Sequence, residues 1–255
     1  MELKDKIIVI TGAASGIGRA MALRFATEAP RRIICADINL IGAKETASAV
    51  RGVALQVDVG LAPEICRLIE IVEDEIGPID LFCSNAGIYT AGGVELPDTD
   101  WQQLWRINVM AHVQAARELV PRMAARGGGY LFNTASAAGL LNQIGSAAYG
   151  VTKHAAVGLA EWLALTHGDA GIKVSVMCPQ AVRTEMIRDL GTNAASIDGI
   201  LEPDVLAETC LQAIRDEVFL VLPHPEVLRY MRVKSENYER WIGGMRKLNR
   251  RFVGS

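Results

Sequence analysis

Residues 6–18 read KIIVITGAASGIG, a short apolar run followed by three closely spaced glycines. The run has the length and β-branched content of a strand, and residues 17–28 after it have the spacing of an amphipathic helix. A glycine turn between a strand and a helix presents unpaired backbone N–H groups that can hold phosphate. The stretch therefore predicts a phosphate-binding strand–turn–helix unit. Because any tight turn can use glycine, its position on the first strand is what gives the motif weight.

The same alternation continues along the chain. Strand-like apolar runs occupy 6–11, 32–37, 53–58, 79–84, 129–134, 172–178 and 218–222. Helical periodicity between them occupies 17–28, 40–50, 63–76, 101–126, 147–168 and 203–217. This alternation predicts a Rossmann-type α/β fold, a doubly wound parallel sheet of about seven strands with helices on both faces. No linker interrupts the alternation, so we expect a single domain over residues 1–255.

Composition limits the class of protein. Half of the 255 residues are apolar and 22% are charged, which is enough to bury a large core without disulfides. The formal net charge of −3 offers nucleic acid no attraction, so we expect no such partner. The five cysteines and four histidines form no ligand pattern, which predicts reduced thiols and no metal. The sequence contains no leader-like or membrane-length apolar run, which predicts a cytoplasmic protein without a membrane partner.

Asp37 stands at the end of the second expected strand, 19 residues after Gly18. A carboxylate at that place can accept hydrogen bonds from the ribose hydroxyls of an adenine dinucleotide. It also repels a 2′-phosphate, and no Lys or Arg stands at Ala14, Ser15 or Ile38 to neutralise one. These residues predict NAD rather than NADP as the cofactor. The alternative is that the carboxylate only caps a loop or helix.

Tyr149 and Lys153 are four residues apart in an expected helix and therefore share one of its faces. A phenol has a reference pKa of about 10, and the positive charges of a nearby ammonium and of the oxidised nicotinamide both lower it. Tyr149 can then exchange a proton with an alcohol or ketone whose oxygen is bound by the Ser136 hydroxyl. Such a pair alone is usually an ordinary helix surface, so this assignment depends on the other motifs.

Taken together, the motifs resemble those of the shorter branch of the short-chain dehydrogenase/reductase family. The resemblance extends from about Leu3 to Leu222. In the family's order and spacing the motifs are Thr11-Gly12-x3-Gly16-x-Gly18, Asp58-Val59, Asn85-Ala86-Gly87, Asn108, Ser136, Tyr149-x3-Lys153 and Pro179 to Thr184. The resemblance implies an enzyme that moves a hydride between NAD and a small-molecule alcohol or ketone.

The resemblance also implies a role for each matched residue. Tyr149 would be the general acid/base, and Ser136 would position the substrate oxygen. Lys153 would hold the nicotinamide ribose and lower the Tyr149 pKa, while Asn108 would anchor a water that connects Lys153 to solvent. The implied cofactor-binding residues are Gly12, Ser15, Gly16, Ile17, Gly18, Asp37, Ile38, Asp58, Val59, Asn85, Ala86, Gly87, Tyr149, Lys153, Pro179, Val182 and Thr184.

One position departs from the family pattern, and three alternatives fit less well. Gln180 stands where the family commonly has glycine, which changes the pocket beside the reacting carbon. Enoyl reductases place the lysine seven positions after the tyrosine, where this chain has Ala156. The longer epimerase and dehydratase branch has a different glycine spacing. A catalytically silent NAD-binding regulator is disfavoured because the serine, tyrosine and lysine are all present.

Two long loops, 89–98 and 179–202, are expected to cover the site. Apolar residues flanking the site predict a bulky, apolar substrate, and they are Leu140, Leu141, Ile144, Ala181, Val182, Met186 and Ile187. The helices at 101–126 and 147–168 are those through which members of the family often assemble. We therefore expect a homo-oligomer, a tetramer or a dimer.

Residues 224–255, called the C-terminal tail below, carry eight Lys or Arg against three Asp or Glu. Apolar residues at near-helical spacing are Val227, Met231, Tyr238, Trp241, Met245, Leu248 and Phe252. The pattern predicts a basic amphipathic helix broken at Gly243-Gly244. We expect the tail to pack on its own chain or on a neighbouring subunit, with a membrane-surface or regulatory contact as the alternative.

Overall fold

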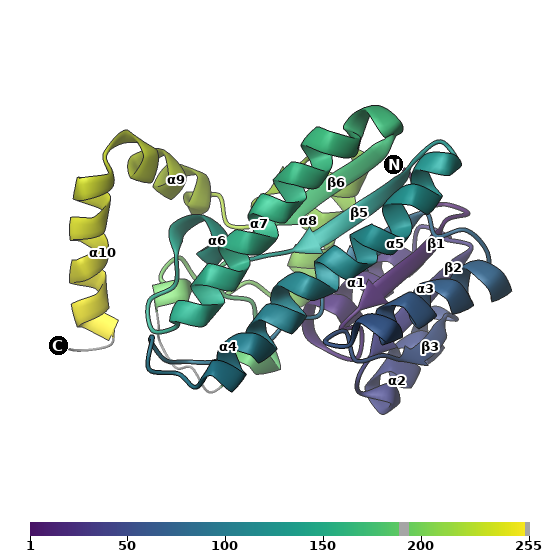
Figure 1. Cartoon of the computed structure of the whole chain (residues 1–255), viewed down its shortest axis with the longest axis horizontal. Coiled ribbons are helices and arrows are strands. Elements are labelled where there is room, and N and C mark those ends of the chain that lie inside the picture. Colours follow the sequence, from purple (N-terminus) through teal and green to yellow (C-terminus); the bar gives the residue numbers. More distant parts are fainter. Residues whose placement is uncertain (189–193, 253–255) are drawn as a thin grey trace.

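The computed structural model of the chain, described for residues 1–188 and 194–252, contains a seven-stranded parallel sheet (Figure 1). The strands are β1 (Ile7–Thr11), β2 (Arg32–Asp37), β3 (Val53–Gln56), β4 (Leu81–Ser84), β5 (Gly129–Thr134), β6 (Ile172–Met177) and β7 (Leu220–Val221). Their spatial order is β3-β2-β1-β4-β5-β6-β7. The order reverses between β1 and β4, which leaves a crevice at the carboxyl ends of these strands.

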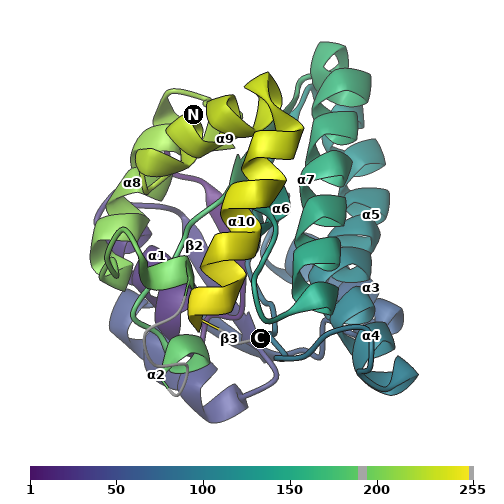
Figure 2. The same cartoon turned by 90° about the vertical axis from the view of Figure 1, so that its left-hand side faces the viewer.

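Helices lie in two layers, one on each face of the sheet, so the predicted fold class is confirmed (Figure 2). One layer is α1 (Gly16–Ala26), α2 (Leu40–Val50) and α8 (Pro203–Arg215), and the other is α3 (Ala62–Glu75), α5 (Ala111–Ala125) and α7 (Ala147–His167). Successive side chains of a strand point to opposite layers: Ile8 joins the core under α1, and Val9 the core under α3. A strand covered on both faces is expected to be almost continuously apolar, and all five residues of β1 are buried, with Thr11 as its one polar residue.

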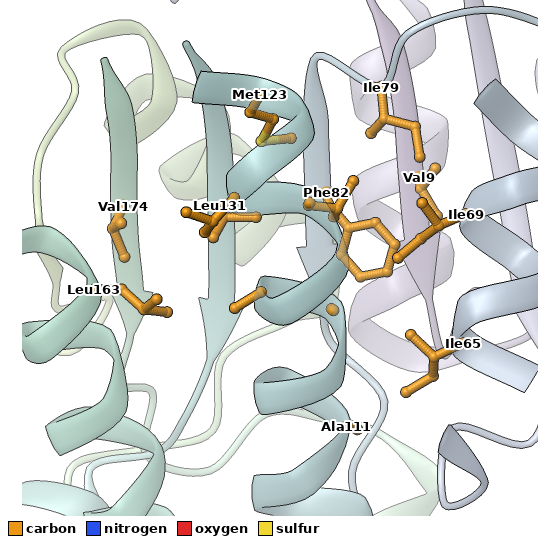
Figure 3. Close-up of a cluster of buried hydrophobic side chains, with 14 of the residues drawn as sticks. Val9, Ile65, Ile69, Ile79, Phe82, Ala111, Met123, Leu131, Leu163 and Val174 are labelled. Atoms are coloured by element: carbon orange, nitrogen blue, oxygen red, sulfur yellow. The ribbon is translucent and has the colours of Figure 1, made fainter. Parts of the chain in front are cut away.

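The core beneath α3, α5 and α7 is built from interlocking aliphatic and aromatic side chains (Figure 3). Phe82 of β4 lies there with Val9 and Ile69, and Leu131 of β5 lies with Met123 of α5. Truncating a buried phenylalanine of this kind to alanine costs about 3–5 kcal/mol. This packing fixes the strands, so the loops at their carboxyl ends start from a rigid platform.

The helix predicted at 101–126 is interrupted by a π-helical turn. α4 (Asp98–Trp105) begins at the acidic residue after Pro97, and the π turn η1 (Arg106–Met110) joins it to α5. Such π turns occur often at functional sites, and this one carries the buried Asn108. The other short elements are α6 (Ala138–Leu141), η2 (Gly168–Ala170), η3 (Glu185–Ile187) and η4 (Ala194–Ser196).

The C-terminal tail forms two helices, α9 (Glu226–Glu236) and α10 (Tyr238–Phe252). The predicted break at Gly243-Gly244 is therefore wrong, because α10 runs through both glycines. The chain turns instead at Asn237, whose extended backbone ends α9 and whose side-chain oxygen accepts a hydrogen bond from Arg240 N at 2.9 Å. Residues 189–193 of the loop 179–202 and residues 253–255 of the tail lie outside the described residues.

Candidate active site

A cleft of about 680 Å³ lies at the carboxyl ends of the strands. The glycine turn after β1, the ends of β2 and β3 and the loops after β4, β5 and β6 all contribute to its wall, together with the first turns of α7. Every predicted cofactor residue except Gly18 lines this cleft. A wider groove of about 1160 Å³ between α1 and α8 contains none of the predicted catalytic residues. The cleft is therefore the candidate site.

The glycine turn has the geometry that a phosphate cradle requires. Gly12 has φ +69°, and a Cβ there would lie 3.0 Å from Ala86 Cα. A Cβ at Gly18 would lie 2.2 Å from the Gly12 carbonyl oxygen, so only glycine lets α1 approach the turn this closely. The backbone of the turn is thus accessible from the cleft. Gly18 does not line the cleft, and its role is to let α1 pack closely against the turn. This local geometry fits a dinucleotide pyrophosphate at the start of α1.

The loop after β4 is held against the first strand by side-chain hydrogen bonds. Thr11 Oγ1 accepts hydrogen bonds from Asn85 N at 3.0 Å and Ala86 N at 3.1 Å. Asn85 Nδ2 donates to the Thr11 carbonyl oxygen at 3.1 Å, and Thr134 Oγ1 donates to Asn85 Oδ1 at 3.1 Å. Asn85 therefore connects three strand ends. Sequence analysis placed Asn85 in this loop but gave Thr11 no such role.

Asp37 is fixed where β2 meets the cleft. Its Oδ2 accepts a hydrogen bond from Ala14 N and its Oδ1 accepts one from Asn39 N, both at 2.9 Å. Each carboxylate oxygen keeps a lone pair for a further donor. The capping role considered from the sequence is therefore present, and it leaves the carboxylate able to bind ribose hydroxyls as well.

Ser136, Tyr149 and Lys153 meet in the cleft wall. Lys153 is 3% exposed, and its Nζ donates a hydrogen bond to the Thr134 carbonyl oxygen at 3.1 Å and lies 5.6 Å from the centre of the Tyr149 ring. Ser136 Oγ donates to the Pro179 carbonyl oxygen at 3.3 Å. Tyr89 packs edge-on against Tyr149 at 5.2 Å between ring centres. The three predicted side chains are thus brought together, and each is held by its own contacts.

Burial dominates the electrostatics of the pair formed by Tyr149 and Lys153. Burial raises the pKa of Tyr149 to about 12, while the neighbouring Ser136 hydroxyl acts in the opposite direction. Burial also lowers the pKa of Lys153 to about 8. The predicted lowering of the Tyr149 pKa by Lys153 and the oxidised nicotinamide together therefore stays a prediction. Desolvation of the phenolate is the largest cause of the raised pKa of Tyr149, and the Lys153 ammonium is engaged with the Thr134 carbonyl.

Close packing against α6 positions the turn of α7 that carries this pair. A Cβ at Gly139 would lie 2.5 Å from the Lys153 carbonyl oxygen, and a Cβ at Gly150 would lie 2.3 Å from Asn142 Oδ1. Ser146, the residue before α7, donates its hydroxyl to the Thr90 carbonyl oxygen at 2.5 Å. Two glycines without room for a side chain therefore set the distance between α7 and the loop after β5.

Asn108 lies behind the cleft and is fully buried. Its Oδ1 accepts a hydrogen bond from Ile88 N at 2.9 Å, and its Nδ2 donates to Ile88 O at 3.0 Å and to Thr152 Oγ1 at 3.3 Å. Both amide hydrogens are used in these contacts. The side chain therefore supports the loop after β4, and its predicted water-anchoring role stays a prediction.

Comparison with known proteins agrees with this geometry. The family described as short chain dehydrogenase matches residues 6–195. The chain belongs to the short-chain dehydrogenase/reductase family. This short-chain dehydrogenase/reductase is an oxidoreductase, and its family uses a nicotinamide cofactor, NAD or NADPH.

Two relatives and two solved structures illustrate the similarity. The chain is 36% identical over 199 residues to 1-deoxy-11-beta-hydroxypentalenate dehydrogenase of Streptomyces exfoliatus, covering 74% of this chain and 72% of that protein. It is 32% identical to human epidermal retinol dehydrogenase 2, over 86% and 74% of the two chains. A short-chain dehydrogenase/reductase from Burkholderia phymatum in complex with NAD has a TM-score of 0.85 and 28% identity, over 94% and 96%. A Sphingobium yanoikuyae enzyme in complex with NADPH has a TM-score of 0.80 and 25% identity, over 93% and 95%.

The substrate side of this short-chain dehydrogenase/reductase is largely apolar. Five of the seven predicted residues line the cleft, namely Ile144, Ala181, Val182, Met186 and Ile187. Leu140 and Leu141, which were also expected to flank the site, do not line the cleft and pack with Val227 of α9. Sequence analysis missed Tyr89 and Phe252, which also line the cleft. Tyr89 lies in a loop that was expected to cover the site, whereas no local pattern places Phe252 there.

Gln180, the departure from the family pattern, connects the cleft to the C-terminal tail. Its Nε2 donates to Asp198 Oδ2 at 2.9 Å, and Tyr230 OH of α9 donates to Asp198 Oδ1 at 2.9 Å. Its backbone N–H donates to His224 Nδ1 at 3.2 Å. The side chain that replaces glycine therefore links the loop after β6 to the tail.

Within residues 1–188 and 194–252, no group of three His, Cys, Asp or Glu side chains could hold a metal ion. All five cysteines are free thiols. Across the same part of the chain, none of the helices combines the length and apolar content that crossing a bilayer requires.

Proposed function

We propose that this enzyme transfers a hydride between NAD and a secondary alcohol or ketone, with Tyr149 as the general acid/base. The observation that carries the proposal is that Ser136, Tyr149, Lys153 and the glycine turn line one cleft. When bound there, the nicotinamide supplies the hydride acceptor or donor and, in its oxidised form, a positive charge. The residues of the chain do the positioning and the proton transfer.

Each of the three polar side chains has a distinct task. Ser136 binds the substrate oxygen and holds it beside the Tyr149 hydroxyl. Tyr149 accepts the proton when an alcohol is oxidised and donates it when a ketone is reduced. Lys153 binds ribose hydroxyls, and because burial lowers its pKa only to about 8, it remains largely protonated at pH 7. Its charge and that of the oxidised cofactor together oppose the burial that raises the pKa of Tyr149.

The preference for NAD rests on Asp37. Its carboxylate stands at the end of β2, in the cleft wall, where the adenosine ribose of a dinucleotide lies in folds of this type. A 2′-phosphate would meet this negative charge. The Burkholderia enzyme in complex with NAD is consistent with this preference, although the Sphingobium enzyme in complex with NADPH shows that the fold accepts either cofactor.

The apolar wall formed by Ile144, Met186 and Ile187 supports an apolar, bulky substrate. The similarity to dehydrogenases named for retinol and for a hydroxypentalenate agrees with this class. The alternative, a catalytically silent NAD-binding regulator, would bind the cofactor without turning over any alcohol. A preference for short, charged hydroxy acids would contradict the proposed substrate class.

We further propose that residues 1–255 act as one NAD-binding domain that assembles into a tetramer or dimer and works in the cytoplasm. Trp162 and Leu165 of α7 are 55% and 86% exposed, an apolar surface that a second copy would cover. Five free thiols are consistent with a reducing compartment. Sedimentation of a monomer at micromolar concentration would contradict the assembly.

The test of the catalytic proposal is absorbance of reduced NAD with a panel of secondary alcohols. The wild type should oxidise apolar members, and Tyr149→Phe should lose at least about 100-fold in kcat. Tyr238→Phe is the matched control because Tyr238 is an exposed tyrosine of α10, and its activity should equal that of the wild type. Equal activity of Tyr149→Phe and wild type would remove the tyrosine mechanism. Cofactor binding without turnover would favour the regulator.

A further inference from the structure

The C-terminal tail lies across the end of the sheet at which the cleft opens. Figure 2 shows α10 crossing this face, with α8 on one side and α7 on the other, and Figure 1 shows it on the side toward which the strands point. The tail comes after β7, and its described part, residues 224–252, contributes no strand to the sheet. The tail is therefore placed where it can contact whatever the cleft binds.

Specific contacts hold α9 on the loops that surround the cleft. Val227 is completely buried against Ala137 and Leu141. Lys234 Nζ donates a hydrogen bond to the Leu140 carbonyl oxygen at 2.5 Å. Tyr230 OH donates to Asp198, the carboxylate that also binds the Gln180 amide. These contacts reach segments on both sides of the active site, after β5 and after β6.

α10 continues from this anchor with one apolar face directed inward. Trp241, Met245, Leu248 and Phe252 follow one another at helical spacing and are half-buried. Trp241 packs with the cluster that anchors α9, and α10 contacts η4. The rest of the helix carries five Lys or Arg residues, all of them exposed. The charged face therefore remains in water while the apolar face covers the protein.

A short chain of contacts connects α10 to the catalytic residues. Ser136 donates its hydroxyl to the Pro179 carbonyl oxygen, and two residues later Ala181 N donates to the Ala195 carbonyl oxygen of η4 at 3.2 Å. α10 contacts η4, and Phe252 at its end lines the same cleft as Ser136 and Tyr149. The segment next to α10 is therefore the loop after β6, whose Met186 and Ile187 form the apolar wall.

We propose that Phe252 is a specificity-determining residue that closes the substrate end of the cleft and limits the length of the apolar alcohol accepted. This inference rests on the proposed function. The Phe252 ring occupies space that the far end of a long substrate would need, and it offers an apolar surface to a shorter one. Replacing the ring with a methyl group opens that space, so additional methylene groups of the substrate can be buried there.

The experiment compares kcat/KM for an unbranched series of 2-alkanols from butanol to dodecanol with saturating NAD. Phe252→Ala should raise kcat/KM for the long members relative to the short ones by at least about tenfold, because burying each methylene contributes severalfold. Phe252→Trp should shift the preference to shorter members. Ile242→Ala is the matched control, since Ile242 is an apolar residue of the same helix that is 49% exposed, and it should keep the wild-type profile.

Cofactor affinity, measured by fluorescence titration with reduced NAD, separates the outcomes. If Phe252 acts on the substrate, the dissociation constant of Phe252→Ala should stay within about twofold of the wild type while the chain-length profile changes. An unchanged profile, with or without weaker cofactor binding, would overturn the inference and leave the proposed function standing. A wild type that oxidises no alcohol of the series or the wider panel would overturn both.

Discussion

The side-chain amide of Asn108 binds both backbone groups of Ile88, accepting from its N–H at 2.9 Å and donating to its carbonyl oxygen at 3.0 Å. The Asn108 side chain thereby satisfies both backbone groups of Ile88, as a neighbouring strand would do in a sheet. The second amide hydrogen goes to Thr152 Oγ1, in the residue before Lys153. Asn108 therefore couples the cofactor loop to the catalytic helix through a single buried group.

Asn108→Ala should remove this coupling and destabilise the protein by about 1–3 kcal/mol, because polar groups of Ile88 and Thr152 lose their partner. Denaturant unfolding measures the loss. The kcat should fall as well, because the loop after β4 and the turn carrying Lys153 would no longer be held together. Asn249→Ala, at an exposed asparagine of α10, is the control and should match the wild type. An Asn108→Ala protein with wild-type stability would show that the coupling does not contribute.

His112 should make the protein sensitive to acid. It is fully buried beside Asn133, with its Nδ1 2.9 Å from Asn133 Oδ1, and burial lowers its pKa to about 4. The unfolded chain, with a pKa near 6.5, then binds more protons than the folded protein between pH 6.5 and 4. The free energy of unfolding should therefore fall as pH falls through this window, by up to roughly 3 kcal/mol from this residue.

The substitution His112→Gln isolates this contribution, because glutamine does not titrate and can still donate to Asn133. Its free energy of unfolding should fall less steeply between pH 6.5 and 4 than that of the wild type. Identical slopes for His112→Gln and wild type would mean that His112 is not held neutral in the folded protein.

Asp37→Asn should weaken the discrimination against NADP. The substitution removes the negative charge that a 2′-phosphate would meet, while the asparagine oxygen can still accept one of the hydrogen bonds from Ala14 and Asn39. The ratio of kcat/KM for NADP to that for NAD should rise at least about tenfold. Asp80→Asn is the control, because Asp80 also accepts a backbone N–H, from Ile7, at the far end of β1. A wild type that prefers NADP would contradict the role assigned to Asp37.

The sequence predicted the parts of the fold and site that depend on local patterns. Residues 7–10 of β1 are apolar because the strand is covered on both faces, and Gly18 is required by its contact with Gly12 within one strand–turn–helix unit. Helical spacing was enough to bring Tyr149 and Lys153 together. The doubly wound arrangement followed from the alternation of strands and helices, since right-handed crossovers can place helices on both faces of a parallel sheet.

Other features depend on packing between distant segments, and the sequence does not contain that information locally. The pKa of Tyr149 is set by how completely its surroundings exclude water, so the spacing to Lys153 could not give its direction. Leu141 packs against Val227, which is far away in sequence. Phe252 lines the cleft at the end of α10, which follows an α9 that packs on Leu141 and binds Asp198. The helix break at Asn237 was missed because a glycine pair is the stronger local signal, yet α10 runs through both glycines.

The glycine pair inside α10 should limit the stability of that helix. Gly243 and Gly244 lie inside α10, both exposed, and a Cβ added to either would meet nothing within 4 Å. Glycine in a helix interior costs about 1 kcal/mol relative to alanine because it has more freedom to lose. Gly243→Ala and Gly244→Ala should therefore each stabilise α10 by about that amount. Backbone amides of α10 that exchange by local opening should exchange about fivefold more slowly in each variant.

Gly158→Ala provides a matched control for this measurement. Gly158 is an exposed glycine inside α7, and a Cβ there also has open space around it. Its substitution should stabilise α7 by a similar amount without slowing exchange in α10. If exchange in α10 is unchanged by Gly243→Ala and Gly244→Ala, residues 238–252 are not a helix that opens locally from the protein. If exchange slows equally in all three variants, α10 opens only when the whole chain unfolds, and its attachment is stronger than its contacts with α9 and η4 indicate.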